Sequence, residues 1–118
     1  EGDLGAGKTT LVRGLVAGLG GSADDVSSPS FVLVQTYPCA AARIERLHHV
    51  DLYRLADRIN ELRALGPDEL LSDPAAVTAI EWPRSSLAAW IPATSRVWCV
   101  SLTMLDGGGR RIEITAPE

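Results

Sequence analysis

Apolar residues recur at intervals of three and four near the start of the chain, at Leu11, Val12, Leu15, Val16 and Leu19. This spacing gathers them on one face of a helix. The glycines and polar residues of positions 20–25 are typical of a helix end followed by a loop. The opening of the chain therefore predicts one amphipathic helix that packs by a single apolar stripe.

The middle of the chain carries a different pattern. Residues 31–37 are rich in β-branched and aromatic types, and residues 43–50 form a second such run. Positions 38–42 would connect them, and so short a link predicts an antiparallel hairpin. Residues 76–80 form a continuous apolar run that ends at Glu81, which predicts a strand buried on both faces.

The remaining segments alternate between helix and strand signals. We expect helices at 58–65, 68–71 and 83–90, the first of them stopped by Gly66-Pro67, and strands at 96–105 and 110–115. The sequence Asp106-Gly107-Gly108-Gly109 between the last two strands is a strong hairpin signal. The sum is an α/β protein: a mixed sheet flanked by helices, with a C-terminal antiparallel hairpin.

A phosphate-binding loop precedes the first helix. Residues 2–9 match the pattern G-x-x-x-x-G-K-[ST]. Its four fixed positions are Gly2, Gly7, Lys8 and Thr9, and the residues between the two glycines are Asp3, Leu4, Gly5 and Ala6. Glycines allow backbone N–H groups to approach phosphate oxygens, a lysine reaches the β- and γ-phosphates, and the Thr hydroxyl ligates Mg²⁺. Residues 2–10, which include Thr10, are thus the predicted nucleotide site. The other interpretation is a glycine-rich turn that happens to precede a helix.

The context of this loop differs from the usual one. Such a loop follows a buried strand, and only Glu1 precedes it here. In a parallel sheet that leading strand is normally central. We therefore expect the leading strand to be missing from this chain, and the 118 residues alone to fold poorly.

Composition limits the possible partners. The chain has 118 residues, 46% of them hydrophobic and 22% charged, with a net charge of −4, which is typical of one globular domain spanning residues 1–118. The chain has no run of basic residues that would bind a nucleic acid directly. It also has no apolar stretch long enough to span a membrane. Cys39 and Cys99 lack metal-ligand spacing and are expected as buried free thiols in the cytoplasm.

Two acids follow the predicted strands. Asp51 and Glu81 each stand at a strand end, where ligands of open α/β sheets bind, although a solvated strand end is the alternative for both. Asp3 could contact metal-bound water or face solvent, and Ser30 could sense the γ-phosphate or belong to an ordinary loop. His48 and His49 point to opposite faces of a strand, which makes a zinc site improbable.

Three motifs together resemble the bacterial TsaE family. They are the phosphate loop with Ser28-Pro29-Ser30-Phe31, then His49-Val50-Asp51-Leu52-Tyr53-Arg54, then Glu81-Trp82-Pro83. The family usually has Thr where Ser30 stands, and the substitution keeps the hydroxyl. The resemblance implies that Gly5, Gly7, Lys8 and Thr9 bind phosphate and Mg²⁺, that Asp51 is the Walker-B-like acid, and that Glu81 is a second acid at the metal.

The resemblance also implies a function. TsaE-like proteins are ATPases of tRNA threonylcarbamoyladenosine biosynthesis that act on a TsaD–TsaB pair, so tRNA would be contacted only through the complex. The implied reaction is Mg²⁺-assisted attack of water on the γ-phosphate of ATP, with Lys8, Asp51 and Glu81 as catalytic residues. Two alternatives stay open: a small-molecule kinase, which shares the same loop, and a nucleotide-gated binding module without turnover.

Overall fold

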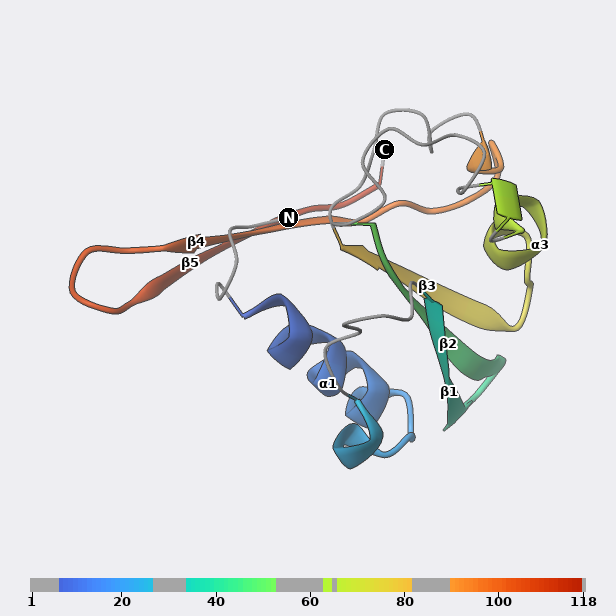
Figure 1. Ribbon diagram of the computed structural model, residues 1–118, viewed down its shortest axis with the longest axis horizontal. Coiled ribbons are helices and arrows are strands. Elements are labelled where there is room, and N and C mark those ends of the chain that lie inside the picture. The colour runs from blue at the N-terminus through green and yellow to red at the C-terminus, as the bar shows by residue number, and fades with distance from the viewer. Residues whose placement is uncertain (1–6, 27–33, 53–62, 65, 82–89, 118) are drawn as a thin grey trace.

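A computed structural model describes residues 7–26, 34–52, 63–64, 66–81 and 90–117 of the chain. Its elements, in chain order, are α1 (Lys8–Gly18), the 3-10 turn η1 (Ala23–Asp25), β1 (Val34–Ala41), β2 (Ile44–Asp51), α3 (Pro67–Leu71), β3 (Ala76–Glu81), β4 (Cys99–Met104) and β5 (Arg110–Thr115). Figure 1 shows a mixed sheet with helices on both sides and a hairpin that extends from it. The predicted α/β class is confirmed for this part of the chain.

The three-stranded sheet has the order β1-β2-β3, with β1 antiparallel and β3 parallel to β2. The predicted hairpin is present, but its bounds differ from the expected ones. β1 continues through Pro38, which pairs with Arg46, and the register shifts between Pro38 and Ala41. Proline is tolerated there because β1 lies at the edge of the sheet formed by the described strands, where a missing N–H removes no ladder bond. The turn is confined to residues 42–43, and Ala42 has a φ of 43°.

The described helices α1 and α3 cover opposite faces of this sheet. Val12 and Val16 of α1 pack with Tyr37 and Leu47 of the strands, and Val77 and Ala79 of β3 join the same cluster. On the other face, Val50 and Leu52 pack with Leu70 and Leu71 of α3 and with Val34, Ile80 and Trp90. Side chains alternate between faces along a strand. The odd-numbered residues of β2 and β3 therefore face α1, and the even-numbered ones face α3.

β3 is less buried than its sequence predicted. Residues 76–80 are all partly exposed, and only Glu81 is buried. Among the described strands β3 pairs with β2 alone, so its other edge is not covered by these residues. The strand does carry packed apolar side chains on both faces, as the continuous apolar run indicated.

The C-terminal hairpin is present as a second, two-stranded sheet. β4 and β5 pair antiparallel from Cys99↔Thr115 to Met104↔Arg110. Gly107 and Gly108, both with positive φ, lie in the turn, as the glycine signal predicted. The first strand begins at Cys99 rather than at residue 96. All residues of β5 are exposed, Ile112 at 58% and Ile114 at 63%.

Other predictions are met in part. The helical turn expected at 68–71 is α3, and Gly66, with a φ of 66°, precedes it. The expected helices at 58–65 and 83–90 fall largely outside the described residues. Cys39 and Cys99 are free thiols, but Cys39 is only partly buried and Cys99 is exposed, so the predicted burial is met in part for Cys39 and is wrong for Cys99. No helix of the described chain is long and apolar enough to cross a membrane.

Candidate nucleotide site

The first helix begins directly after the glycine motif. Gly7 is its N-cap with a φ of 110°, and the first helical bond runs from the Leu11 N–H to the Gly7 carbonyl at 2.9 Å. Any helix leaves the N–H groups of its first turn without intrahelical acceptors, and its dipole adds positive potential there. Lys8 adds a cationic side chain and is only 9% exposed. This helix end is suited to binding an anion.

The two predicted acids terminate neighbouring strands. β2 ends at Asp51 and β3 at Glu81, and these residues are partners in the parallel ladder. The Leu52 N–H donates to the Glu81 carbonyl at 3.1 Å, which ties the two strand ends together. Both acids have odd numbers and so share the α1 face of the sheet. Figure 1 shows that the N-terminal end of α1 lies toward the end of the sheet at which β2 and β3 terminate.

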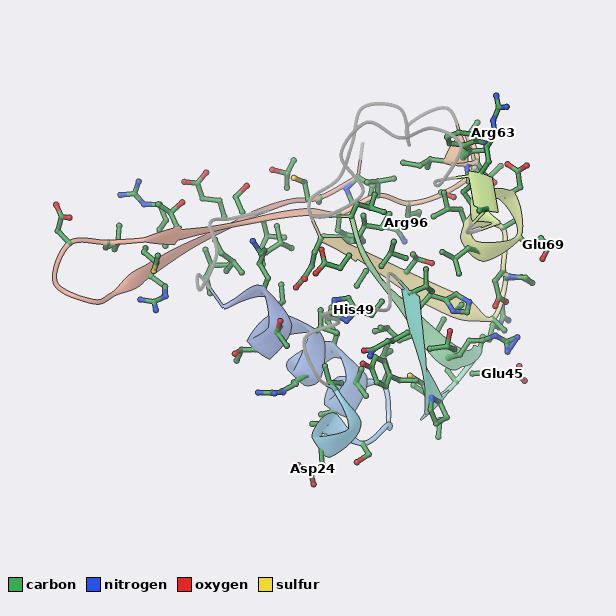
Figure 2. All side chains as sticks on the ribbon, in the orientation of Figure 1. Asp24, Glu45, His49, Arg63, Glu69 and Arg96 are labelled. Carbon is green, nitrogen blue, oxygen red and sulfur yellow. The ribbon has the colours of Figure 1, made fainter. Side chains whose placement is uncertain are left out.

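His49, which opens one of the three family motifs and was otherwise weighed only as a zinc ligand, accompanies these acids. His49 is completely buried, and its Nε2 lies 3.6 Å from Oε2 of Glu81, which is 7% exposed. Figure 2 shows His49 on the side of the sheet that faces α1. The signal that could have found it was strand alternation, because a residue two positions before Asp51 must share its face.

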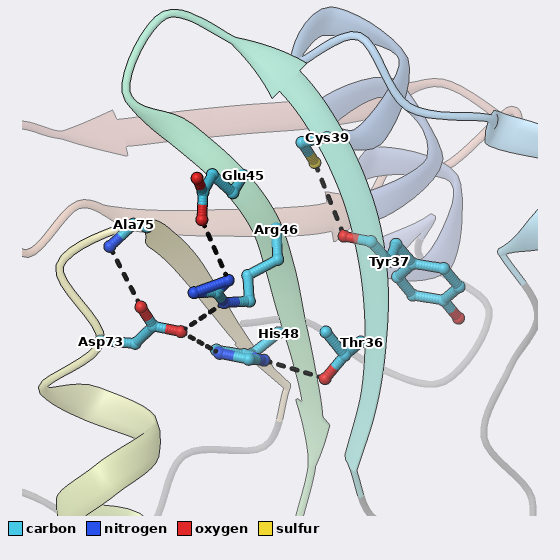
Figure 3. Close-up of polar contacts among 8 residues, drawn as sticks. All are labelled: Thr36, Tyr37, Cys39, Glu45, Arg46, His48, Asp73 and Ala75. Atoms are coloured by element: carbon cyan, nitrogen blue, oxygen red, sulfur yellow. Dashed lines mark hydrogen bonds and ion pairs between the residues drawn. The ribbon is translucent and has the colours of Figure 1, made fainter.

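The neighbouring histidine belongs to a separate network on the other face (Figure 3). His48 Nδ1 is 2.9 Å from the Thr36 hydroxyl, and its Nε2 is 3.0 Å from Oδ2 of Asp73. Arg46 Nε donates to the same Asp73 oxygen at 2.7 Å, and the Ala75 N–H donates to Oδ1 at 3.0 Å. The His48 hydrogen bond, then that of Ala75, and the nearby Arg46 charge hold the pKa of Asp73 below its ordinary value.

This network has a structural role. It connects both strands of the hairpin to the segment between α3 and β3, and it satisfies both nitrogens of His48. The prediction that the two histidines point to opposite faces is confirmed, since their partners lie on opposite sides of the sheet. They cannot share a metal.

Comparison with known proteins decides the family. The sequence model of one family, described as threonylcarbamoyl adenosine biosynthesis protein TsaE, matches residues 1–112. The chain belongs to the TsaE family. It is 42% identical over 118 residues to a protein of Nostoc sp., covering 98% of this chain and 67% of that relative. It is 33% identical over 114 residues to one of Borreliella burgdorferi, covering 97% and 77%.

A third relative, from Streptomyces coelicolor, is 46% identical over 82 residues, which is 70% of this chain and 53% of that protein. All three are named tRNA threonylcarbamoyladenosine biosynthesis protein TsaE. The chain thus spans about half the length of the S. coelicolor member of the TsaE family. The resemblance drawn from the three motifs is confirmed at the level of the family.

The described residues fit a magnesium–phosphate ligand better than a metal held by protein alone. No three His, Cys, Asp or Glu side chains of the described residues come together as a metal-binding group. Mg²⁺ is usually held by one or two carboxylates together with substrate phosphates. Asp51 and Glu81 are the candidates for such a pair, and Oε1 of Glu81 is buried without a hydrogen-bond partner among the described residues.

Several predicted contacts lie outside the described residues. They are Gly2, Asp3, Leu4, Gly5 and Ala6 of the loop and Ser30 of the second motif. Of the described loop residues, Lys8 is buried, Thr9 is partly buried and Thr10 is exposed. Their roles as ligands of a nucleotide remain predictions.

Proposed function

We propose that this TsaE-family chain binds ATP with Mg²⁺ and hydrolyses its γ-phosphate in the biosynthesis of threonylcarbamoyladenosine in tRNA. The observation that carries the proposal is the placement of Gly7, Lys8 and Thr9 at the start of α1, toward the sheet end where Asp51 and Glu81 terminate adjacent strands. Phosphate-binding residues and metal-binding acids are the two parts that phosphoryl transfer requires.

The start of α1 would hold the phosphates. Its N–H groups donate to phosphate oxygens, and Lys8 places a compact positive charge near the β- and γ-phosphates. Because these donors are fixed before the nucleotide arrives, they stabilise the charge of the transferring group with little reorganisation. Lys8 is also the only lysine among the eleven basic residues of the chain, so no neighbouring lysine can replace it.

The acids and Thr9 would hold the metal. Mg²⁺, when it is bound, would neutralise part of the negative charge of the phosphates. Asp51 and Glu81 are direct neighbours in a parallel ladder, in which strands lie about 4.8 Å apart. Two carboxylates at such spacing favour a cation between them. The Thr9 hydroxyl would hold the metal from the helix and Glu81 from the sheet, and Asp51 would contact it through water.

The partners would be TsaD- and TsaB-like proteins. The chain has a net charge of −4 and no basic run, which disfavours direct binding to the phosphate backbone of tRNA. A role in tRNA modification is compatible with this charge if partner proteins hold the tRNA. The cytoplasm, where tRNA is modified, is the compartment we propose.

The test is phosphate release from ATP by the full-length protein, with and without a TsaD–TsaB pair. We expect slow release alone and faster release with the partners. Lys8→Ala should reduce the rate by about 10²-fold, since it removes a preorganised donor to the transferring group. Arg110→Ala, at the tip of the exposed hairpin, is the matched control for loss of one positive charge and should keep the wild-type rate.

A second pair of substitutions tests the role of the acidic residues. Glu81→Gln should lose Mg²⁺-dependent turnover, whereas Glu69→Gln on α3 should not, because Glu69 is exposed and lies in the helix that covers the opposite face. Transfer of phosphate to a small acceptor would identify a kinase instead. Tight nucleotide binding with no release, even with partners present, would identify a nucleotide-gated binding module.

A further inference from the structure

The described residues contain one group of buried polar atoms that lack hydrogen-bond partners. They are Nδ1 and Nε2 of His49 and Oε1 of Glu81. Nearly all buried polar atoms in native proteins are hydrogen-bonded, and the exceptions are often functional. These three atoms belong to two residues whose side chains approach to 3.6 Å. The position of the group, beside the acid pair at the strand ends, suggests that it serves the site.

The sheet register explains how the two side chains meet. His49 is the ladder partner of Ala79, and Glu81 is the next residue of β3 on the same face. The ring and the Glu81 carboxylate therefore meet diagonally across the two strands. The Nε2–Oε2 distance of 3.6 Å is slightly longer than a hydrogen bond. Contacts of this kind commonly shorten when the ligand binds.

We propose that His49 is a positioning residue for Glu81. When Mg²⁺ is bound, the imidazole would donate its Nε2–H to Oε2 of Glu81, and this hydrogen bond would orient the carboxylate so that Oε1 is available to the metal. Carboxylates and imidazoles at metal sites usually have such an outer partner, which fixes the geometry of the ligand. The inference rests on the proposed function, because it assigns the metal to Glu81.

His48 shows that a hydrogen-bonded histidine is achievable in this same strand. Both of its nitrogens have partners in the fold, namely Thr36 and Asp73. Leu47, two residues before His49, and its ladder partner Ala79 are apolar and share its face, so packing alone would be served by an apolar side chain at position 49. The polar ring is therefore explained by its contact with the acid.

The experiment measures the affinity of the full-length protein for a fluorescent ATP analogue, once with Mg²⁺ and once with EDTA. The ratio of the two affinities reports the contribution of the metal. His49→Leu, which keeps volume but removes the donor, should reduce this ratio by 10-fold or more, with the EDTA affinity unchanged. His49→Gln should retain most of the ratio, because its amide N–H can reach the Nε2 position. His49→Asn should not, because its shorter side chain cannot.

The control is His48→Gln on the opposite face, which should keep the wild-type ratio. In a Glu81→Gln background, His49→Leu should cause no further loss. Thermal unfolding of the nucleotide-free protein, with and without Mg²⁺, checks that each variant folds. If His49→Leu does not fold, the affinity ratios of His49→Gln and His49→Asn test the proposal instead. An unchanged ratio in His49→Leu, equal ratios in the Gln and Asn variants, or an equal loss with Mg²⁺ and EDTA would overturn the proposal. Absence of nucleotide binding in the wild type would instead refute the proposed function.

Discussion

Replacing Gly7 by alanine tests whether the start of α1 is a phosphate site or only a helix cap. Gly7 has a φ of 110°, which side-chain-bearing residues rarely adopt. A Cβ built there meets no atom within 4 Å among the described residues. The substitution therefore adds backbone strain without a steric clash, and it places a methyl group beside the N–H groups at the helix start.

The size of the effect follows from these two facts. Holding a residue in a sparsely populated region of backbone conformation costs about 1–3 kcal/mol. Alanine also reduces the entropy of the unfolded chain, which returns about 0.4–1 kcal/mol. The difference between these ranges predicts that Gly7→Ala lowers the free energy of unfolding by about 0–2.6 kcal/mol, with a midpoint of about 1.3 kcal/mol. Nucleotide affinity should fall by at least about 10-fold, corresponding to about 1.4 kcal/mol, because the methyl group displaces the phosphate from the amides.

The assay is urea unfolding of the nucleotide-free full-length protein together with titration of a fluorescent ATP analogue. Gly66→Ala is the matched control. Gly66 also precedes a helix, has a φ of 66°, and has open space at its Cβ position, but it precedes α3 on the other face. It should lose about 1 kcal/mol of stability and no nucleotide affinity. Equal affinity losses in the two variants, or wild-type affinity in Gly7→Ala, would refute the reasoning.

Three further predictions concern stability. Leu47→Ala should lower the free energy of unfolding by about 2–5 kcal/mol, since Leu47 is completely buried between α1 and the sheet; a loss below about 1 kcal/mol in urea unfolding would contradict that packing. Gly14→Ala should raise it by about 0.5–1 kcal/mol, because Gly14 lies in the exposed interior of α1 with open space at its Cβ; unchanged thermal unfolding would contradict this. Asp73 has a folded pKa below its ordinary value of 3.8, so the unfolded state binds more protons in that range. The stabilisation by Asp73 is present above pH 3.8 and is lost as pH falls through the folded pKa; Asp73→Asn should remove this part of the acid dependence, measured by unfolding at a series of pH values.

Much of the fold could be predicted because its signals are local. The signals for the helix after the glycine motif, for the hairpin around Gly107 and Gly108, and for the strand leading to Glu81 all lie in consecutive residues. The errors arose where neighbours decide the outcome. Pro38 looked like a strand end, yet it continues β1 because its strand lies at a sheet edge. Cys99 looked like a core residue, yet it is exposed on the hairpin strand β4.

The sequence by itself determined the family, and it contains the glycine motif of residues 2–9 and the acids Asp51 and Glu81 on which the nucleotide prediction rests, because each depends on residue types at fixed short spacings. Only the tertiary structure decided which groups meet. Asp51 and Glu81 become neighbours through the parallel pairing of β2 and β3, and that pairing brings His49 to the same carboxylate. The adjacent His48 instead joins Asp73 on the opposite face. His48 and His49 are consecutive residues of one strand, so their side chains lie on opposite faces of the sheet. The helix that packs on each face determines the surroundings of each histidine.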